Sequence, residues 1–190
     1  MKVTPLGIPD VLLIEPHVFE DSRGFFFESF REDIFKHKTS LDVSFVQDNH
    51  SKSFQGVLRG LHYQLPPYGQ GKLTRVIQGE VLDVAVDIRE SSPTCGHYVA
   101  EILSSVNKKQ LYVPEGFAHG FLTLSQTSEY LYKTTDFYHS ESERCIIWND
   151  TTLNIDWPKD LDIQLSPKDL LGQSFKSSEL FAFKQIMTTD

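Results

Sequence analysis

The residues best suited to chemistry lie in the stretch 56–64, which reads GVLRGLHYQ. It sets the guanidinium of Arg59 and the imidazole of His62 among apolar residues, with glycines at positions 56 and 60. The pattern is too short and too interrupted for a helix and predicts a strand, in which Gly60 lets a backbone or a ligand approach closely. Two interpretations stay open from this stretch alone. Either the strand presents His62 and Arg59 to a cavity, or His62 is merely hydrogen-bonded in a half-buried strand and Arg59 is solvated.

Basic residues beside glycines form a second group of candidates. Arg23, Arg59 and Lys72 each adjoin a glycine in an otherwise acidic chain. Glycine backbone beside a cationic side chain suits the approach of an anion, and the arginine fork matches the oxygens of a phosphate. Together they indicate a diphosphate ligand, whereas each one alone is more simply explained as a surface charge.

Two further side chains have a local support that suits a cavity wall. His119 follows the turn at 114–116 (PEG) and stands at the start of an expected strand. Tyr132 shares strand parity with Tyr130 and Thr134, so one face of this strand should turn inward. A tyrosine hydroxyl in a cavity can act as a general acid, and the alternative is an aromatic core residue.

The composition limits the partners and the compartment. The chain has 190 residues, with 18 Lys plus Arg against 26 Asp plus Glu, which gives a net charge of −8. Such an acidic protein is poorly suited to nucleic acid. The sequence contains no run of about 18 apolar residues, so no membrane span is expected. It also starts without a secretory signal. Cys95 and Cys145 are expected as reduced thiols, and a cytoplasmic location is expected.

Short strands follow one another at intervals of about ten residues, with turn signals between them. This pattern is typical of an antiparallel sandwich or barrel. The expected strands lie within 10–19, 24–30, 43–51, 56–64, 72–78, 81–88, 97–103, 109–113, 118–124, 129–135 and 144–148.

Other segments complete the expected architecture. A helix of two turns is expected over 31–38, with Ile34 and Phe35 inward, and a second over 177–187. The Gly79-Glu80 link predicts a tight hairpin between its two flanking strands. No repeat, low-complexity tract or flexible linker is visible, so residues 1–190 are expected to form one domain.

Three motifs together resemble the dTDP-4-dehydrorhamnose 3,5-epimerase family. They are VLRGLHYQ at 57–64, PEGFAHGF at 114–121 and YLYKTT at 130–135, supported by DSRGFF at 21–26, QDN at 47–49 and LSPKD at 165–169. The resemblance runs from about Gly7 to Leu170. It implies an all-β, cupin-like antiparallel jelly-roll sandwich with short peripheral helices. It also implies a homodimer whose N-terminal strands are shared across the interface.

The resemblance implies a reaction and roles for four residues. It is the epimerisation of dTDP-4-dehydro-6-deoxy-D-glucose at C3 and C5 to dTDP-4-dehydro-L-rhamnose, a step toward surface polysaccharide. An enolate forms and is reprotonated from the opposite face. His62 would be the base, Asp169 would fix its tautomer, Tyr132 would be the acid, and Lys72 would stabilise the charge on the ketone oxygen.

The resemblance also implies the ligand contacts. Arg23 and Arg59 would bind the diphosphate, and Tyr138 would stack on the thymine. Phe19, Arg23 and Glu28 would serve the neighbouring subunit's site, because the N-terminal strands reach across the dimer. The remaining contacts are Phe19, Glu28, Gln47, Asn49, His119, Glu143 and Lys168.

No metal or other cofactor is expected. Metal-binding cupins need two histidines one residue apart, but the second position after His62 is Gln64. His119 with one further imidazole does not complete a metal site.

Three alternatives stay open. A mono-epimerase would act at only C5 or C3 of a related keto-sugar, and proton exchange at one carbon would identify it. A keto-isomerase on the same scaffold would move the carbonyl. A non-catalytic sugar-nucleotide-binding cupin would bind the ligand without turnover.

Overall fold

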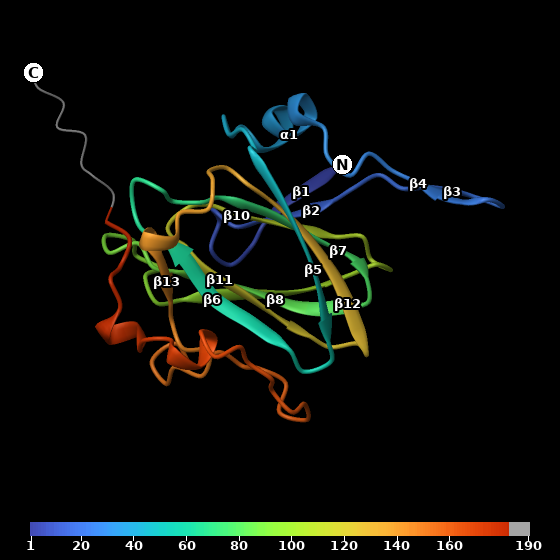
Figure 1. Ribbon diagram of the computed structural model, residues 1–190. Helices are drawn as coiled ribbons and strands as arrows, with labels where there is room; N and C mark the ends of the chain where they lie inside the picture. Colours follow the sequence, from blue (N-terminus) through green and yellow to red (C-terminus); the bar gives the residue numbers. More distant parts are fainter. Residues whose placement is uncertain (183–190) are drawn as a thin grey trace, which may run out of the picture.

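Two antiparallel sheets face one another in the computed structural model, which describes residues 1–182 (Figure 1). The larger sheet has the order β1 (Lys2–Pro5), β2 (Leu12–Glu15), β10 (Gln110–Val113), β7 (Lys72–Gln78), β12 (Thr127–Thr134), β5 (Gln47–Phe54). The smaller has the order β13 (Glu143–Cys145), β6 (Leu58–Gln64), β11 (Phe117–Thr123), β8 (Glu80–Asp87), β9 (Tyr98–Ser104). The expectation of an all-β, cupin-like jelly-roll sandwich is confirmed.

Short elements lie outside the two sheets. The hairpin of β3 (Phe19–Asp21) and β4 (Gly24–Phe26) projects from the body at the right of Figure 1. The helix α1 (Glu32–Thr39) buries Phe35 against the outer face of the larger sheet, as expected. The described residues also form three single-turn 3₁₀ helices. η1 (Ser140–Ser142) lies just before β13, and η2 (Asp169–Leu171) and η3 (Phe175–Ser177) follow the last strand of the sheets.

The smaller sheet is covered on both faces. Its inner face contributes Val81 and Phe121 to the core between the sheets, where they join Tyr130 of the larger sheet. On its outer face, Val84 and Val86 belong to a second cluster with residues of the C-terminal segment, such as Trp157. Strand β8 therefore alternates between two buried faces, because successive side chains point to opposite sides of a sheet.

The prediction of a hairpin at Gly79-Glu80 is wrong. Strand β7 pairs with β10 and β12, whereas β8 pairs with β11 and β9, so the link carries the chain from one sheet to the other. Gly79 has φ +79°, and a Cβ there would lie 2.1 Å from the carbonyl oxygen of Thr127. A glycine marks a tight corner here, which its local sequence does not distinguish from a hairpin turn.

The expected C-terminal helix over 177–187 is also wrong for the part that the structure describes. Residues 178–182 are not helical, and 183–187 lie outside the described residues. Phe181 is 3% exposed within the outer cluster. Its backbone forms a parallel bridge to Arg89, so this segment is held as an extended strap. Several strand bounds also shift: for example, the strand expected over 24–30 ends at Phe26, that expected over 43–51 begins at Gln47, and that expected over 144–148 ends at Cys145.

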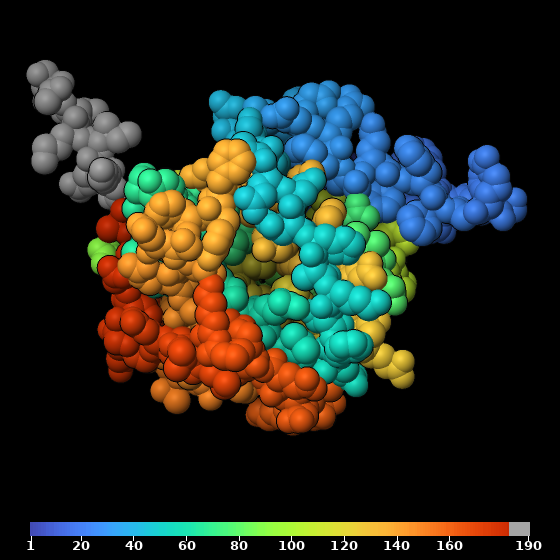
Figure 2. Space-filling model, in the orientation of Figure 1, coloured from blue at the N-terminus to red at the C-terminus, as the bar shows by residue number. Residues whose placement is uncertain are grey.

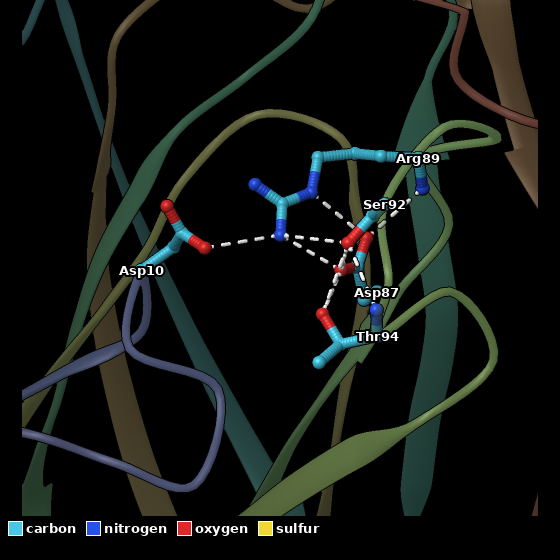
Figure 3. A network of polar contacts seen from close by, with 5 residues as sticks. All are labelled: Asp10, Asp87, Arg89, Ser92 and Thr94. Atoms are coloured by element: carbon cyan, nitrogen blue, oxygen red, sulfur yellow. Dashed lines mark hydrogen bonds and ion pairs between the residues drawn. The ribbon is translucent and has the colours of Figure 1, made fainter.

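A buried carboxylate fixes the loop after β8 (Figure 3). Asp87 accepts hydrogen bonds from Arg89 Nε at 2.8 Å, Ser92 Oγ at 2.6 Å and Thr94 Oγ1 at 2.6 Å. Arg89 also reaches Asp10 at 3.1 Å, which ties the loop to the chain before β2. Burial raises the pKa of Asp87, but these donors outweigh it and lower the pKa to about 2. The network is therefore a fully paired anchor.

No helix among the described residues is long and apolar enough to cross a membrane.

Candidate active site

A cavity of about 410 Å³ opens between the two sheets. Its mouth lies in the centre of the face shown in Figure 2, between the cyan chain of β5 and β6 and the orange-red chain beyond residue 160. Its walls come from β5, β6, β7, β11 and β12 and from the loop that leads into η2. The lining residues are Asn49, His50, Ser51, Arg59, His62, Lys72, His119, Gly120, Phe121, Tyr130, Tyr132, Ser166, Lys168 and Asp169.

His62 and Asp169 form a hydrogen-bonded pair in this cavity. His62 Nε2 lies 2.5 Å from Asp169 Oδ1, and the Asp169 side chain is almost fully buried. Burial raises the pKa of Asp169, but the hydrogen bond and charge of His62 outweigh it, so the net pKa is lowered. An ionised carboxylate only accepts hydrogen bonds, so Nε2 carries the proton and the lone pair of the neutral ring is on Nδ1. Within the described residues, Nδ1 has no hydrogen-bond partner.

The position of His62 depends on a close approach of two strands. Gly60 on β6 has φ +131°, and a Cβ there would lie 2.6 Å from the Cα of Gly120 on β11. The glycine thus admits a neighbouring backbone, one of the two uses that the sequence allowed. In the same pairing His62 stands opposite His119.

Lys72 begins β7 on the opposite wall and is 9% exposed. Its Nζ donates to the backbone carbonyl of His62 at 3.3 Å. Burial lowers the pKa of Lys72 to about 8, although the charges of Asp83 and Glu143 oppose this shift. An ammonium in such a water-poor position interacts strongly with a developing negative charge.

Tyr132 and Tyr130 both face the cavity from β12, as their shared parity predicts. Tyr132 is the more accessible, and no described residue hydrogen-bonds to its hydroxyl. Burial raises the pKa of Tyr132, partly offset by the charge of Arg59, so the phenol holds its proton at neutral pH. Tyr132 comes from the larger sheet and His62 from the smaller, so the two groups stand on facing walls.

A buried network beneath the cavity includes a residue that the sequence reasoning missed, Asp83 on β8. Asp83 is fully buried, with its carboxylate accepting from His119 Nε2 at 2.7 Å, Thr74 Oγ1 at 3.1 Å and the hydroxyl of Tyr130. Burial lowers the pKa of His119, so this imidazole is neutral. The available signal was an aspartate at an apolar-strand position, in the run VLDVAVDI at 81–88.

The predicted ligand contacts Arg59 and Lys168 lie at the cavity. The Arg59 guanidinium donates to Ser53 Oγ at 3.1 Å and to the Lys52 carbonyl at 3.3 Å. Lys168 forms an ion pair with Glu143. Both cations are exposed to solvent.

Other predicted contacts lie at or beside the cavity rim. Asn49 lines the cavity and accepts from Gln47 Nε2 at 2.9 Å. Tyr138 is 56% exposed, and its hydroxyl donates to Glu143 Oε2 at 2.6 Å. The backbone of Tyr138 donates to Gln47 Oε1 at 3.2 Å. These contacts connect the predicted nucleotide residues to one another.

Three predicted contacts do not reach this cavity in the single chain. Phe19, Arg23 and Glu28 line two other hollows, next to the projecting hairpin and α1. Arg23 is paired with Asp21 at 2.6 Å. The hairpin leaves Phe19, Phe25 and Phe26 between 58% and 67% exposed.

One group of potential metal ligands is present in the described part of the chain. It consists of His62, Cys145 and Asp169, whose ligand atoms lie within 4.8 Å of one another. Cys145 does not line the cavity, and burial raises the pKa of its thiol to about 12. The prediction that catalysis needs no metal stays a prediction.

Comparisons with known proteins agree with this arrangement. A family model described as dTDP-4-dehydrorhamnose 3,5-epimerase matches residues 5–177. Proteins of that name from Pseudomonas aeruginosa and Shigella flexneri are 57% and 56% identical over 181 residues, which is 95% of this chain and 99% of each relative. A crystal structure of dTDP-6-deoxy-D-glucose-3,5-epimerase from Legionella pneumophila, in complex with dTDP-4-keto-L-rhamnose, superposes with a TM-score of 0.93. It is 46% identical, and the alignment covers 96% of this chain and 98% of that one.

Proposed function

This chain belongs to the dTDP-4-dehydrorhamnose 3,5-epimerase family, and we propose that His62, Tyr132 and Lys72 carry out its reaction. The enzyme is an isomerase that epimerises C3 and C5 of dTDP-4-dehydro-6-deoxy-D-glucose to give dTDP-4-dehydro-L-rhamnose. The proposal concerns which side chains move the protons, which bind the substrate and what the enzyme assembles with.

The observation that carries the proposal is that base and acid stand on facing sheets. The 4-ketone makes the hydrogens on C3 and C5 acidic, and inversion needs a proton removed from one face and returned to the other. His62 on β6 offers the unprotonated Nδ1 toward one side of a bound ring. Tyr132 on β12 offers a protonated phenol from the other side.

Lys72 supplies the charge that the enolate needs. Its ammonium is held in a buried position beside the backbone of His62. C3 and C5 both flank the C4 carbonyl, so one cation at that oxygen stabilises the enolate of either step. This shared position explains how one site can invert two centres.

Asp169 is the positioning residue for the base. Its carboxylate accepts the Nε2 proton of His62 and so keeps the lone pair on Nδ1. It also stabilises the imidazolium that forms when His62 takes a proton from the sugar. Without this carboxylate both tautomers of His62 would be populated.

The nucleotide end of the substrate lies, in this proposal, on the rim of the cavity. Arg59 and Lys168 line the cavity and are exposed, so a diphosphate can reach them. Cationic side chains form strong, charge-assisted hydrogen bonds with phosphate oxygens. Tyr138 presents an exposed ring for the thymine. His119, a buried residue of the cavity lining, meets the sugar. The remaining predicted contacts close this rim: Gln47, Asn49 and Glu143.

We further propose a homodimer in which the N-terminal hairpin reaches the partner. The support is an arm with three exposed phenylalanines, an apolar surface that a monomer rarely leaves in water. In this arrangement Phe19, Arg23 and Glu28 contact the substrate of the neighbouring subunit. Light scattering should give twice the mass of 21.8 kDa, and Arg23→Ala should raise KM without changing that mass.

We also propose that residues 1–190 form one catalytic domain, that it needs no cofactor and that it works in the cytoplasm. Epimerisation moves protons only, so no electron carrier is required. Both cysteines are free thiols, the state that a reducing compartment maintains.

Proton exchange tests the reaction itself. The enzyme and its substrate are mixed in deuterated water and followed by NMR. Deuterium should enter at both C3 and C5. Entry at one carbon only would identify a mono-epimerase, and ligand binding without any exchange would identify a sugar-nucleotide-binding cupin.

A further inference from the structure

The thiol of Cys145 lies beside His62 and has no part in the proton transfer described above. Strand β13 pairs with β6 in a register that sets Cys145 directly opposite His62. One ligand atom each from Cys145, His62 and Asp169 lies within 4.8 Å of the other two. Among residues 1–182 no other set of three histidine, cysteine or acidic side chains comes this close together.

We propose that these three residues form an inhibitory site for a thiophilic divalent cation such as Zn²⁺. A thiolate, an imidazole and a carboxylate are ligands that Zn²⁺ accepts, with a fourth position left for water. Thiolate and carboxylate together balance the charge of the ion, and the thiol proton leaves to solvent as the ion binds. Mg²⁺ and Ca²⁺ prefer sets made of oxygen ligands and should not compete.

The geometry requires a small adjustment. Zinc bond lengths put the ligand atoms of a tetrahedral site about 3.4–3.6 Å apart. His62 and Asp169 are 2.5 Å apart, so their hydrogen bond must open while the thiol moves inward. The backbone of Cys145 is held by a hydrogen bond from Gln173 at 2.9 Å, so the adjustment falls to the side chains of Cys145 and Asp169, and the thiol gives up its 3.6 Å contact with the Ile146 carbonyl.

The position of the ion predicts the type of inhibition. Nε2 is the ring nitrogen that faces Asp169, so an ion held by both residues binds Nε2 and places the ring proton on Nδ1. His62 then has no lone pair to accept a proton from the sugar. Cys145 does not line the substrate cavity, so the ion should lower kcat and leave KM nearly unchanged. This half of the inference rests on the proposed role of His62.

Two cysteine variants test the inhibition. The enzyme is freed of metal with EDTA, and its activity is measured against ZnCl₂ with MgCl₂ as the comparison salt. Zn²⁺ should inhibit the wild type reversibly. Cys145→Ser should need about tenfold more Zn²⁺ or greater, while Cys95→Ser, the matched control, should behave like the wild type. Equal sensitivity of Cys145→Ser and the wild type would overturn the site.

Cobalt binding provides a readout that needs no turnover. Co²⁺ bound through a thiolate gives a charge-transfer absorption in the near ultraviolet. The wild type and Cys95→Ser should show this band with one ion per chain, and Cys145→Ser and His62→Asn should lose it. A band that persists in Cys145→Ser would refute the site. If the metal-free wild type shows no epimerase activity but its Co²⁺ form shows the band, the proposed reaction is refuted and the metal site stands.

Discussion

Replacing Lys72 by methionine should make the protein more stable and nearly inactive. The side chain is buried at the cavity wall, and burial lowers its pKa from 10.5 to about 8 despite the opposing charges of Asp83 and Glu143. The folded protein therefore holds an ammonium where a neutral group would be favoured. We attribute this cost to function, because the enolate needs a cation at that position.

The pKa sets both the size of the effect and its pH window. The difference between 10.5 and about 8 corresponds to about 3 kcal/mol of unfolding free energy. The unfolded chain binds this proton more tightly than the folded one. The destabilisation is therefore complete below about pH 8 and disappears as the pH rises to about 10.5. Methionine removes the charge at every pH.

Urea denaturation at two pH values measures this contribution. Lys72→Met should exceed the wild type by about 3 kcal/mol at pH 7 and by much less at pH 10. Its kcat should fall by about 10²–10³-fold. Lys2→Met, at a side chain that is 73% exposed, should change stability by less than about 1 kcal/mol. The reasoning fails if Lys72→Met is less stable than the wild type at pH 7 or keeps activity within about tenfold.

Four further predictions test other parts of the account. In a pH profile, kcat/KM should fall as the pH rises through about 8, where Lys72 loses its proton. The charge of Glu143 raises the pKa of Lys72, so Glu143→Gln should move this fall to lower pH. An unchanged profile in Glu143→Gln would contradict the assignment of the fall to Lys72. Asp169→Asn should lower kcat about 10²-fold or more in steady-state assays with KM nearly unchanged, and a change confined to KM would contradict the positioning role. Arg59→Ala should raise KM about 10–100-fold, the effect of losing a charge-assisted bond to phosphate, and an unchanged KM would exclude it from the diphosphate site. Phe181→Ala should lower the unfolding free energy by about 3–5 kcal/mol in urea with KM unchanged, and an unaffected stability would show that the C-terminal strap does not hold the outer cluster.

The sequence predicted the strands well because short alternating segments carry their own signal. The segment 72–78 is recovered with its bounds as β7. The pattern does not specify which strands pair, because pairing depends on contacts between residues far apart in the chain. Gly79 shows this limit, since the same glycine serves a hairpin or a corner between sheets.

The site was predicted through motifs more than through periodicity. The parity of Tyr130 and Tyr132 placed both on one inward face, which the structure bears out. Asp83 was missed because its partners Thr74 and His119 come from other strands. Phe181 was expected in a peripheral helix, and its burial depends on a cluster formed by strands β6, β8 and β11 of the smaller sheet together with the C-terminal segment. Such long-range burial leaves no local periodicity to detect.

The claim that His62 and Tyr132 act from opposite faces is tested most directly by stereochemistry in deuterated water. With Tyr132→Phe, NMR should show deuterium entering at C3 and C5 with the configuration retained, because His62 still removes each proton and returns a deuteron to the same face. With His62→Asn, neither exchange nor inversion should occur. Inversion by Tyr132→Phe at the wild-type rate, or continued exchange by His62→Asn, would contradict the account.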